Sequence, residues 1–313
     1  MQIVGKTNID FIGLRKYAWT FSGIMLIIGI ISLVWIFVGQ ADLSIDFAGG
    51  TLVQGAFEKP IDVSNLRNGL ANDGFSDASI QAVFGGTYEN TYNIKVKSAG
   101  AGGAEDQTVA EQLLAAIKQE FPDNTFKMDS VQEVGPTVGQ ELQTQAQKAV
   151  VIALLGILIY IWIRFDFRFS VAATICTFHD VLVVLGFMFL LQREISLLVV
   201  SALLTLAGYS LTDTVVVFDR IRESLKQFRK RGDFVGAVNG AINDMLSRTI
   251  ITSLTTFIAV LVVLFLCGAV VRDFALALSF GVLIGTYSSI FVAAPIVVEW
   301  EARSPKRFAA TTK

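Results

Sequence analysis

Ionisable side chains inside apolar sequence are the residues of this chain that could do chemistry. Asp213 lies in the stretch 195–218, which is long and apolar enough to span a membrane. A carboxylate in the middle of a spanning helix costs about 2.5–3.5 kcal/mol on insertion scales, so such a group faces a bundle interior or a water-filled cavity. Asp213 is therefore a candidate carrier of protons or other ions.

Arg248 opens the next apolar stretch and is the expected partner of Asp213. Ser210 lies within one helical turn of Asp213, and Thr252 shares a helical face with Arg248. These residues predict a polar strip between two helices. Two other interpretations stay open beside a proton carrier. One is a fixed salt bridge that locks the helices, and the other is an Arg248 that simply lies at the membrane surface.

His179 and Asp180 form a second polar pair, near the middle of the stretch 170–191. Histidine titrates near neutral pH, which suits a proton relay. Adjacent helical residues point about 100° apart, so the two side chains need not face one cavity. A relay and a structural network both remain open. One histidine and one carboxylate do not make a metal site. No motif for ATP hydrolysis or covalent catalysis is present, so we expect no enzyme and no cofactor, with protons as the coupling ion.

The elements that must hold these groups are six apolar stretches. The chain has 313 residues, of which 53% are hydrophobic, a content typical of membrane proteins. Its net charge of −2 gives no sign of a nucleic-acid partner. The fold class expected is a polytopic α-helical membrane protein with spans at 17–38, 144–163, 170–191, 195–218, 249–266 and 274–298.

Lysine and arginine in the short loops predict the orientation. One set of loops carries many of them, including Lys16, the cluster at 220–231 and the tail 301–313. The opposite short loops carry Arg193 and Arg272. We therefore expect the N-terminal segment 1–16 and the tail to be cytoplasmic, where basic residues meet lipid headgroups. The segment 39–143 is expected outside.

This outside segment is expected to fold as an extracytoplasmic α+β domain of the ferredoxin-like type. Alternating apolar residues and turn signals predict strands at 51–57, 79–84, 91–97 and 126–134, with helices at 62–73 and 105–121. The resulting order is β-α-β-β-α-β.

A row of small residues at intervals of four marks the last span: Ala277, Gly281, Gly285, Ser289 and Ala293. Small residues four apart let helices approach closely, so the row predicts a helix–helix seam. Whether the seam lies inside the bundle or faces another subunit is open.

Several segments resemble the SecD/SecF family of the bacterial protein-export apparatus. SIDFAGGT is shared by both kinds of member, and GYSLTDTVVVFDRIRE followed by LSRTIIT is typical of the SecF members. The segments are Ser44–Thr51, Val134–Gly139 (VGPTVG), His179–Val181, Gly208–Glu223 and Leu246–Thr252. One departure is Thr212, where the family usually has Asn, so the tuning of Asp213 can differ here.

The resemblance implies half of a transporter of the resistance-nodulation-division superfamily, in the bacterial plasma (inner) membrane. It implies SecD as an obligate partner, association with the SecYEG channel and use of the proton-motive force to draw out unfolded preproteins after SecA has acted. Asp213 and Arg248 match the family's proton pathway. His179, Asp180, Ser210, Thr212 and Thr252 are secondary candidates for it, and Asp46, Gly49 and Gly50 match a structural motif. Half of a small-molecule exporter and a purely structural translocon stabiliser are the alternatives.

Overall fold

Six long apolar helices form the membrane part of the protein in the computed structural model, which describes residues 7–76, 78–83, 90–96, 108–228, 233–268 and 270–303. The first six residues and the tail beyond Arg303 lie outside these ranges. The expected six-span architecture is confirmed. The helices are α1 (Arg15–Phe37), α5 (Pro136–Arg164), α6 (Phe167–Leu190), α7 (Leu197–Phe228), α8 (Phe234–Leu266) and a sixth made of α9 (Arg272–Ser288), the π-helix η1 (Ser289–Ala293) and α10 (Ala294–Arg303).

Helices α7 and α8 extend well past the apolar stretches expected from the sequence. The expected start of the fifth span at Thr249 is wrong as a helix boundary, because α8 begins at Phe234. Asp233 caps this helix by accepting the N–H of Gly236 at 2.8 Å. The first turns of α8 contribute small and apolar side chains to the same core as the end of α7 (Val238, Ala241, Ile242, Met245 and Leu246). A hydropathy window finds the part that suits lipid rather than the whole helix.

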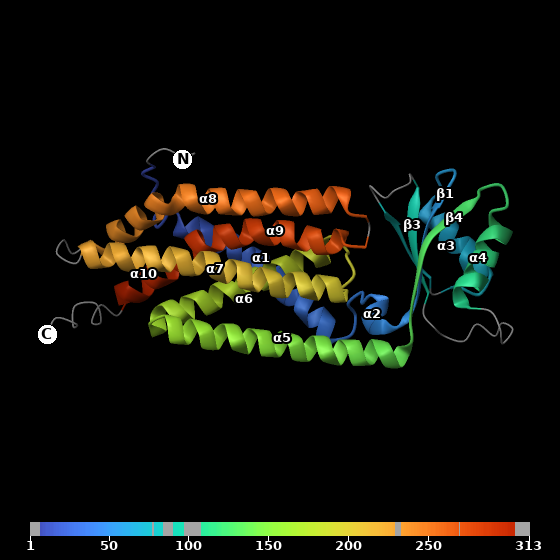
Figure 1. Cartoon of the computed structure of the whole chain (residues 1–313), viewed down its shortest axis with the longest axis horizontal. Helices are drawn as coiled ribbons and strands as arrows, with labels where there is room; N and C mark the ends of the chain where they lie inside the picture. The colour runs from blue at the N-terminus through green and yellow to red at the C-terminus, as the bar shows by residue number, and fades with distance from the viewer. Residues whose placement is uncertain are drawn as a thin grey trace.

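The segment 39–143 contains the expected β-α-β-β-α-β unit. Its strands are β1 (Gly50–Phe57), β2 (Ser79–Val83), β3 (Thr91–Val96) and β4 (Phe126–Val134), and its helices are α3 (Val63–Asn72) and α4 (Val109–Glu120). All pairs are antiparallel in the order β2-β3-β1-β4. Residues 84, 97 and 105–107 of the expected elements lie outside the described residues. Helices α3 and α4 cover one face (Figure 1) and bury a core that includes Leu66, Leu70, Ile94 and Leu113.

Two tight glycine-containing segments join this domain to the bundle. The chain leaves α1, forms the short helix α2 (Ile45–Ala48) and enters β1 through Gly49 and Gly50, whose φ angles are +72° and +128°. These angles suit glycine because it has no Cβ. The return path from β4 enters α5 at Pro136, earlier than the expected 144. Because Gly139 lies against Gly49, a Cβ on Gly139 would be 3.0 Å from the Gly49 nitrogen.

Figure 1 places the domain at one end of the bundle and the start of α1, together with α10, at the other end. Helix α9 lies centrally and contacts α6, α7 and α8. The small-residue row is an internal seam. A Cβ on Gly281 would meet the Leu206 side chain of α7 at 2.6 Å, and one on Gly285 would meet Ser210 at 3.3 Å. Helices α7 and α9 therefore pack closely along this row, beside Ser210 of α7.

Candidate functional site

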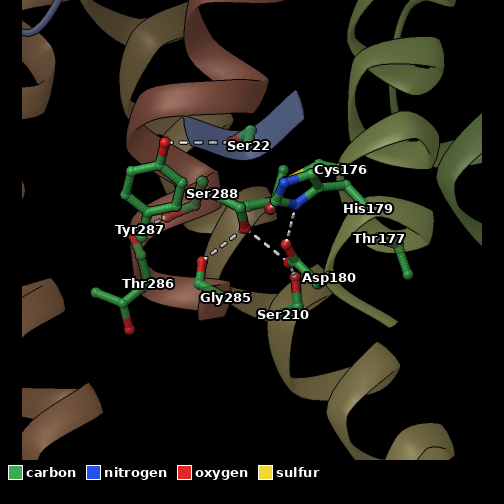
Figure 2. Close-up of polar contacts among 12 residues, drawn as sticks. Ser22, Cys176, Thr177, His179, Asp180, Ser210, Gly285, Thr286, Tyr287 and Ser288 are labelled. Atoms are coloured by element: carbon green, nitrogen blue, oxygen red, sulfur yellow. Dashed lines mark hydrogen bonds and ion pairs between the residues drawn. The ribbon is translucent and has the colours of Figure 1, made fainter. Parts of the chain in front are cut away.

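Asp180 is the centre of a buried polar network in the bundle. Its side chain has no exposed surface, and its Oδ2 accepts hydrogen bonds from two serine hydroxyls (Figure 2). One comes from Ser210 on α7, and the other comes from Ser288 on α9 at 2.6 Å. A buried carboxylate needs partners of this kind because it has left water. Asp180 therefore joins three helices through hydrogen bonds.

His179 faces the same carboxylate, although neighbouring helical side chains need not do so. Its Nδ1 lies 2.8 Å from Asp180 Oδ1, and both side chains are buried. Among the described residues, Nε2 of His179 has no hydrogen-bond partner. The structure thus brings the expected second polar pair together with Ser210, which was a secondary candidate.

Asp213 lies on α7, one turn beyond Ser210, and is only partly buried. Its Oδ2 accepts a hydrogen bond of 2.7 Å from Ser289, the first residue of η1. The two carboxylates are close enough for their charges to interact. Consecutive serines on the last span, Ser288 and Ser289, therefore bond to Asp180 and Asp213 respectively.

The expected Asp213–Arg248 ion pair is not formed. Within the described residues, no ion pair reaches Arg248, whose side chain is exposed on α8. Thr252 is exposed as well, and its hydroxyl donates to the Arg248 carbonyl at 3.1 Å. The side chains of Arg248 and Thr252 thus point away from the network. Arg248 was paired with Asp213 from its depth in the sequence, but depth does not fix the direction in which a helix face points.

Thr212 is also exposed and donates to the carbonyl of Gly208 at 2.9 Å, within its own helix.

Asp46 lies apart from the polar pairs, at the start of α7. Its Oδ2 accepts the N–H of Leu197 at 2.9 Å, which is the first residue of α7. Helix N-termini carry N–H groups without partners, and Asp46 provides an acceptor for one of them. The contact therefore supports a structural role for the motif of Asp46, Gly49 and Gly50.

Sequence reasoning missed several hydroxyl groups that complete the site. Ser288 was not singled out, and Ser289 was counted only as a small residue of a packing seam. Cys176 is buried beside the network, with Thr214 Oγ1 3.8 Å from its sulfur. The signal that could have found the serines is the run of four hydroxyl residues at 286–289 inside an apolar span.

These features define a multi-pass membrane protein that holds ionisable groups within its helix bundle. Residues 113–303 match the family model described as protein export membrane protein SecD/SecF, C-terminal. The chain is 46% identical over 299 residues to protein translocase subunit SecF of Thermodesulfovibrio yellowstonii, covering 95% of this chain and 96% of that protein. It is 45% identical to the SecF of Magnetococcus marinus, covering 100% of this chain and 98% of that protein.

A solved structure of SecDF from Thermus thermophilus, described as a translocon-associated membrane protein, superposes with a TM-score of 0.80 and 36% identity. The match covers 95% of this chain and 39% of the SecDF chain. A second SecDF structure, in a super-membrane-facing form, gives a TM-score of 0.68 at 34% identity, covering 100% of this chain and 41% of that chain. The chain therefore belongs to the SecD/SecF family, and its full-length curated relatives are SecF subunits.

Proposed function

We propose that this chain is the SecF-type subunit of a bacterial protein-export complex that uses the proton-motive force to promote preprotein translocation. The partner is SecD, the coupling ion is the proton, and the step follows the SecA-driven entry of the preprotein into the SecYEG channel. Family membership supports the export role, because the relatives are named protein translocase subunits. SecD would supply the part of the solved SecDF chain that this chain does not cover.

The observation that carries the proton role is the setting of Asp213. A partly buried carboxylate in a spanning helix has a hydroxyl partner rather than a cation. Because a hydroxyl can donate to an ionised carboxylate or accept from a protonated one, Ser289 can serve both protonation states. A static salt bridge with Arg248 receives no support from this geometry, so the purely structural alternative is the weaker one.

Arg248 and the outer face of α8 support the need for a partner subunit. A guanidinium at the edge of the apolar part of α8 is unfavourable against lipid. Helices α5 and α8 also turn most of their apolar surface outward. We assign SecD to cover part of this surface, which would place Arg248 and Thr252 at the subunit interface. Arg248 then belongs to the proton pathway of the complex rather than to a pair within this chain.

The orientation in this proposal follows the positive-inside rule. The protein lies in the bacterial plasma (inner) membrane, both termini are cytoplasmic, and 39–143 is extracytoplasmic. The start of α1 and helix α10 lie at the bundle end opposite the domain, and this placement is consistent with that orientation (Figure 1). A small-molecule exporter is disfavoured by the family of the chain.

The test replaces Asp213 by Asn in the complex with SecD and measures export by membrane vesicles at fixed ATP, with and without a proton-motive force. Moving one charge through 100 mV is worth about 2.3 kcal/mol, and a group that cannot titrate cannot capture it. We expect the proton-dependent part of export to be lost and the SecA-driven part to remain. Arg248→Met should give the same loss.

The matched control is Asp244→Asn, an equal change at an exposed carboxylate that pairs with Arg220 on the cytoplasmic side of the bundle in this orientation. It should leave both parts of export unchanged. Full proton-dependent export by Asp213→Asn at normal protein levels would reject the proton role.

A further inference from the structure

Four consecutive hydroxyl side chains connect the last span to four neighbouring helices. Successive helical residues point about 100° apart, so a run of four surrounds the helix axis. A central helix can therefore bond to a different neighbour at each position. Thr286 donates to Ser253 of α8 at 2.6 Å, Tyr287 to the Ala18 carbonyl of α1 at 2.8 Å, Ser288 to Asp180 of α6 at 2.6 Å and Ser289 to Asp213 of α7 at 2.7 Å.

Ser288 and Ser289 each have a second acceptor within their own helix. Ser288 Oγ lies 3.1 Å from the Gly285 carbonyl, and Ser289 Oγ lies 3.1 Å from the Thr286 carbonyl. A hydroxyl has one proton, so it donates either to the carboxylate or back to the helix. An ionised carboxylate accepts this proton. A protonated carboxyl donates its own proton to Oγ instead, which leaves the serine proton for the carbonyl.

The helix changes its hydrogen-bond pattern where these two serines lie. Ser288 is the last residue of α9, and Ser289 is the first residue of η1. Short π-helical turns are rare and occur often at functional sites. A change in the direction of either serine hydroxyl therefore acts where the hydrogen-bond pattern of the helix changes.

His179 offers a place for a second proton. With Asp180 accepting from Nδ1, the neutral ring has its free lone pair on Nε2, which is buried and without a partner in the described chain. A proton from solvent that binds Nε2 makes an imidazolium, whose positive charge faces the Asp180 carboxylate. No other bond has to break.

We propose that His179–Asp180 is a second proton-binding site, and that Ser288 and Ser289 couple its protonation to that of Asp213. This inference rests on the proposed proton role of Asp213. Ser288 and Ser289 are positioning residues here, since the structure gives no direct hydrogen bond between them along which a proton could pass. The coupling is a linkage between two binding equilibria, so each site changes the proton affinity of the other by the same factor.

Other ionisable groups around the pair are few among the described residues. Cys176 of α6 is bonded by Thr214, and the Tyr287 hydroxyl is engaged by α1. Helix α1 presents Ser22 rather than a charged group, and Arg248 of α8 is exposed. Arg164 of α5 bonds to Asp219, and Glu301 of α10 bonds to Arg168. Asp213 is thus the charged group best placed to affect His179.

The test uses the fact that the chain has one histidine. The chain is labelled with ¹⁵N-histidine, carries an affinity tag without histidine and is reconstituted in bilayers with unlabelled SecD. Solid-state NMR then follows the ring of His179 against pH. Replacing Asp213 by Asn removes a negative charge, so the His179 midpoint should move about one unit to lower pH, a tenfold change in proton affinity. In the Ser288→Ala/Ser289→Ala background this shift should shrink to less than half.

Ser279→Ala is the matched control, because Ser279 is also buried on α9 and has no hydrogen-bond partner among the described residues. It should leave the full shift in place. If the alanine pair lowers the yield of the complex, Ser→Cys at both positions keeps the volume with a weaker donor and should give the same reduction. An unmoved midpoint in Asp213→Asn, or an equal shift with and without the serines, would overturn the coupling. Both results are independent of export, so they do not decide the proposed function.

Discussion

At the scale of single residues, Asp46 shows how a side chain outside the polar network supports it. Its carboxylate accepts the first N–H of α7, the helix that carries Ser210 and Asp213. Asp46→Ala should destabilise the complex by about 1 kcal/mol, the usual effect of losing a helix N-terminal acceptor. Asp46→Asn keeps an acceptor oxygen and should lose much less. Thermal unfolding of the complex measures both, and equal losses would contradict the capping role.

The residues of the polar network were predictable to different degrees. Asp213, His179 and Asp180 stand out because ionisable groups are rare in spans and need buried partners. Their bonding partners could not be predicted, since serine is a common small residue in helix seams. Ser289 was assigned to packing on that ground. Arg248 was paired with Asp213 from depth alone, and only the rotation of α8 shows that its side chain points away.

At the scale of elements, the helices that pack backbone to backbone are the most sensitive to substitution. A Cβ on Gly29 of α1 would overlap the Leu182 carbonyl of α6, and one on Gly186 would lie 2.7 Å from the Gly29 nitrogen. Backbone atoms cannot rotate away as the Leu206 side chain can beside Gly281. No sequence pattern predicts this crossing, because single glycines without a regular spacing are ordinary in spans.

Gly29→Ala should therefore separate α1 from α6 and destabilise the complex by about 1–3 kcal/mol, the range for overpacked interiors. Gly23→Ala on the same helix is the matched control, since its Cβ would meet no atom of the described chain within 4 Å. Alanine is the better helix former, so Gly23→Ala should be neutral or slightly stabilising. Thermal unfolding again separates them. Equal stability of the two variants would mean that α1 and α6 do not pack as closely as the contacts of Gly29 and Gly186 indicate.

The elements of the α+β domain were predicted more accurately than the ends of the spanning helices. Strand β4 has the boundaries expected from alternation, and the sheet order matches the ferredoxin-like pattern. Strand periodicity and turn residues are local signals. The ends of α7 and α8 depend on burial against each other outside the apolar stretch. That burial is a tertiary effect, so hydropathy averaged over a stretch of sequence cannot predict it.

At the scale of the whole molecule, one buried lysine connects the domain to the bundle. Lys95 of β3 bonds to Asp42 and Glu194 at 3.1 Å each and to the Leu43 carbonyl at 2.8 Å. The backbone of Ile195 pairs with the same linker. Beside this junction lies a cleft of about 230 Å³ between the open face of the sheet and the end of the bundle. A domain that moves relative to the bundle has to break these contacts.

Lys95→Met should loosen this junction in a way that acid partly reverses. Burial raises the pKa of Glu194 above its ordinary 4.5, and Lys95 opposes the rise. The protonated form therefore stabilises the docked domain fully below pH 4.5, and this contribution is lost as pH rises through the raised pKa. Without Lys95 the pKa of Glu194 rises further, so docking should be weakest at neutral pH, where the unpaired carboxylates of Asp42 and Glu194 face each other.

Hydrogen exchange of segments 42–46 and 194–197 in the complex measures the docking. Lys127→Met, at an exposed lysine of β4, should change nothing. Unaltered protection in Lys95→Met at neutral pH would show that the backbone contacts alone hold the domain in place.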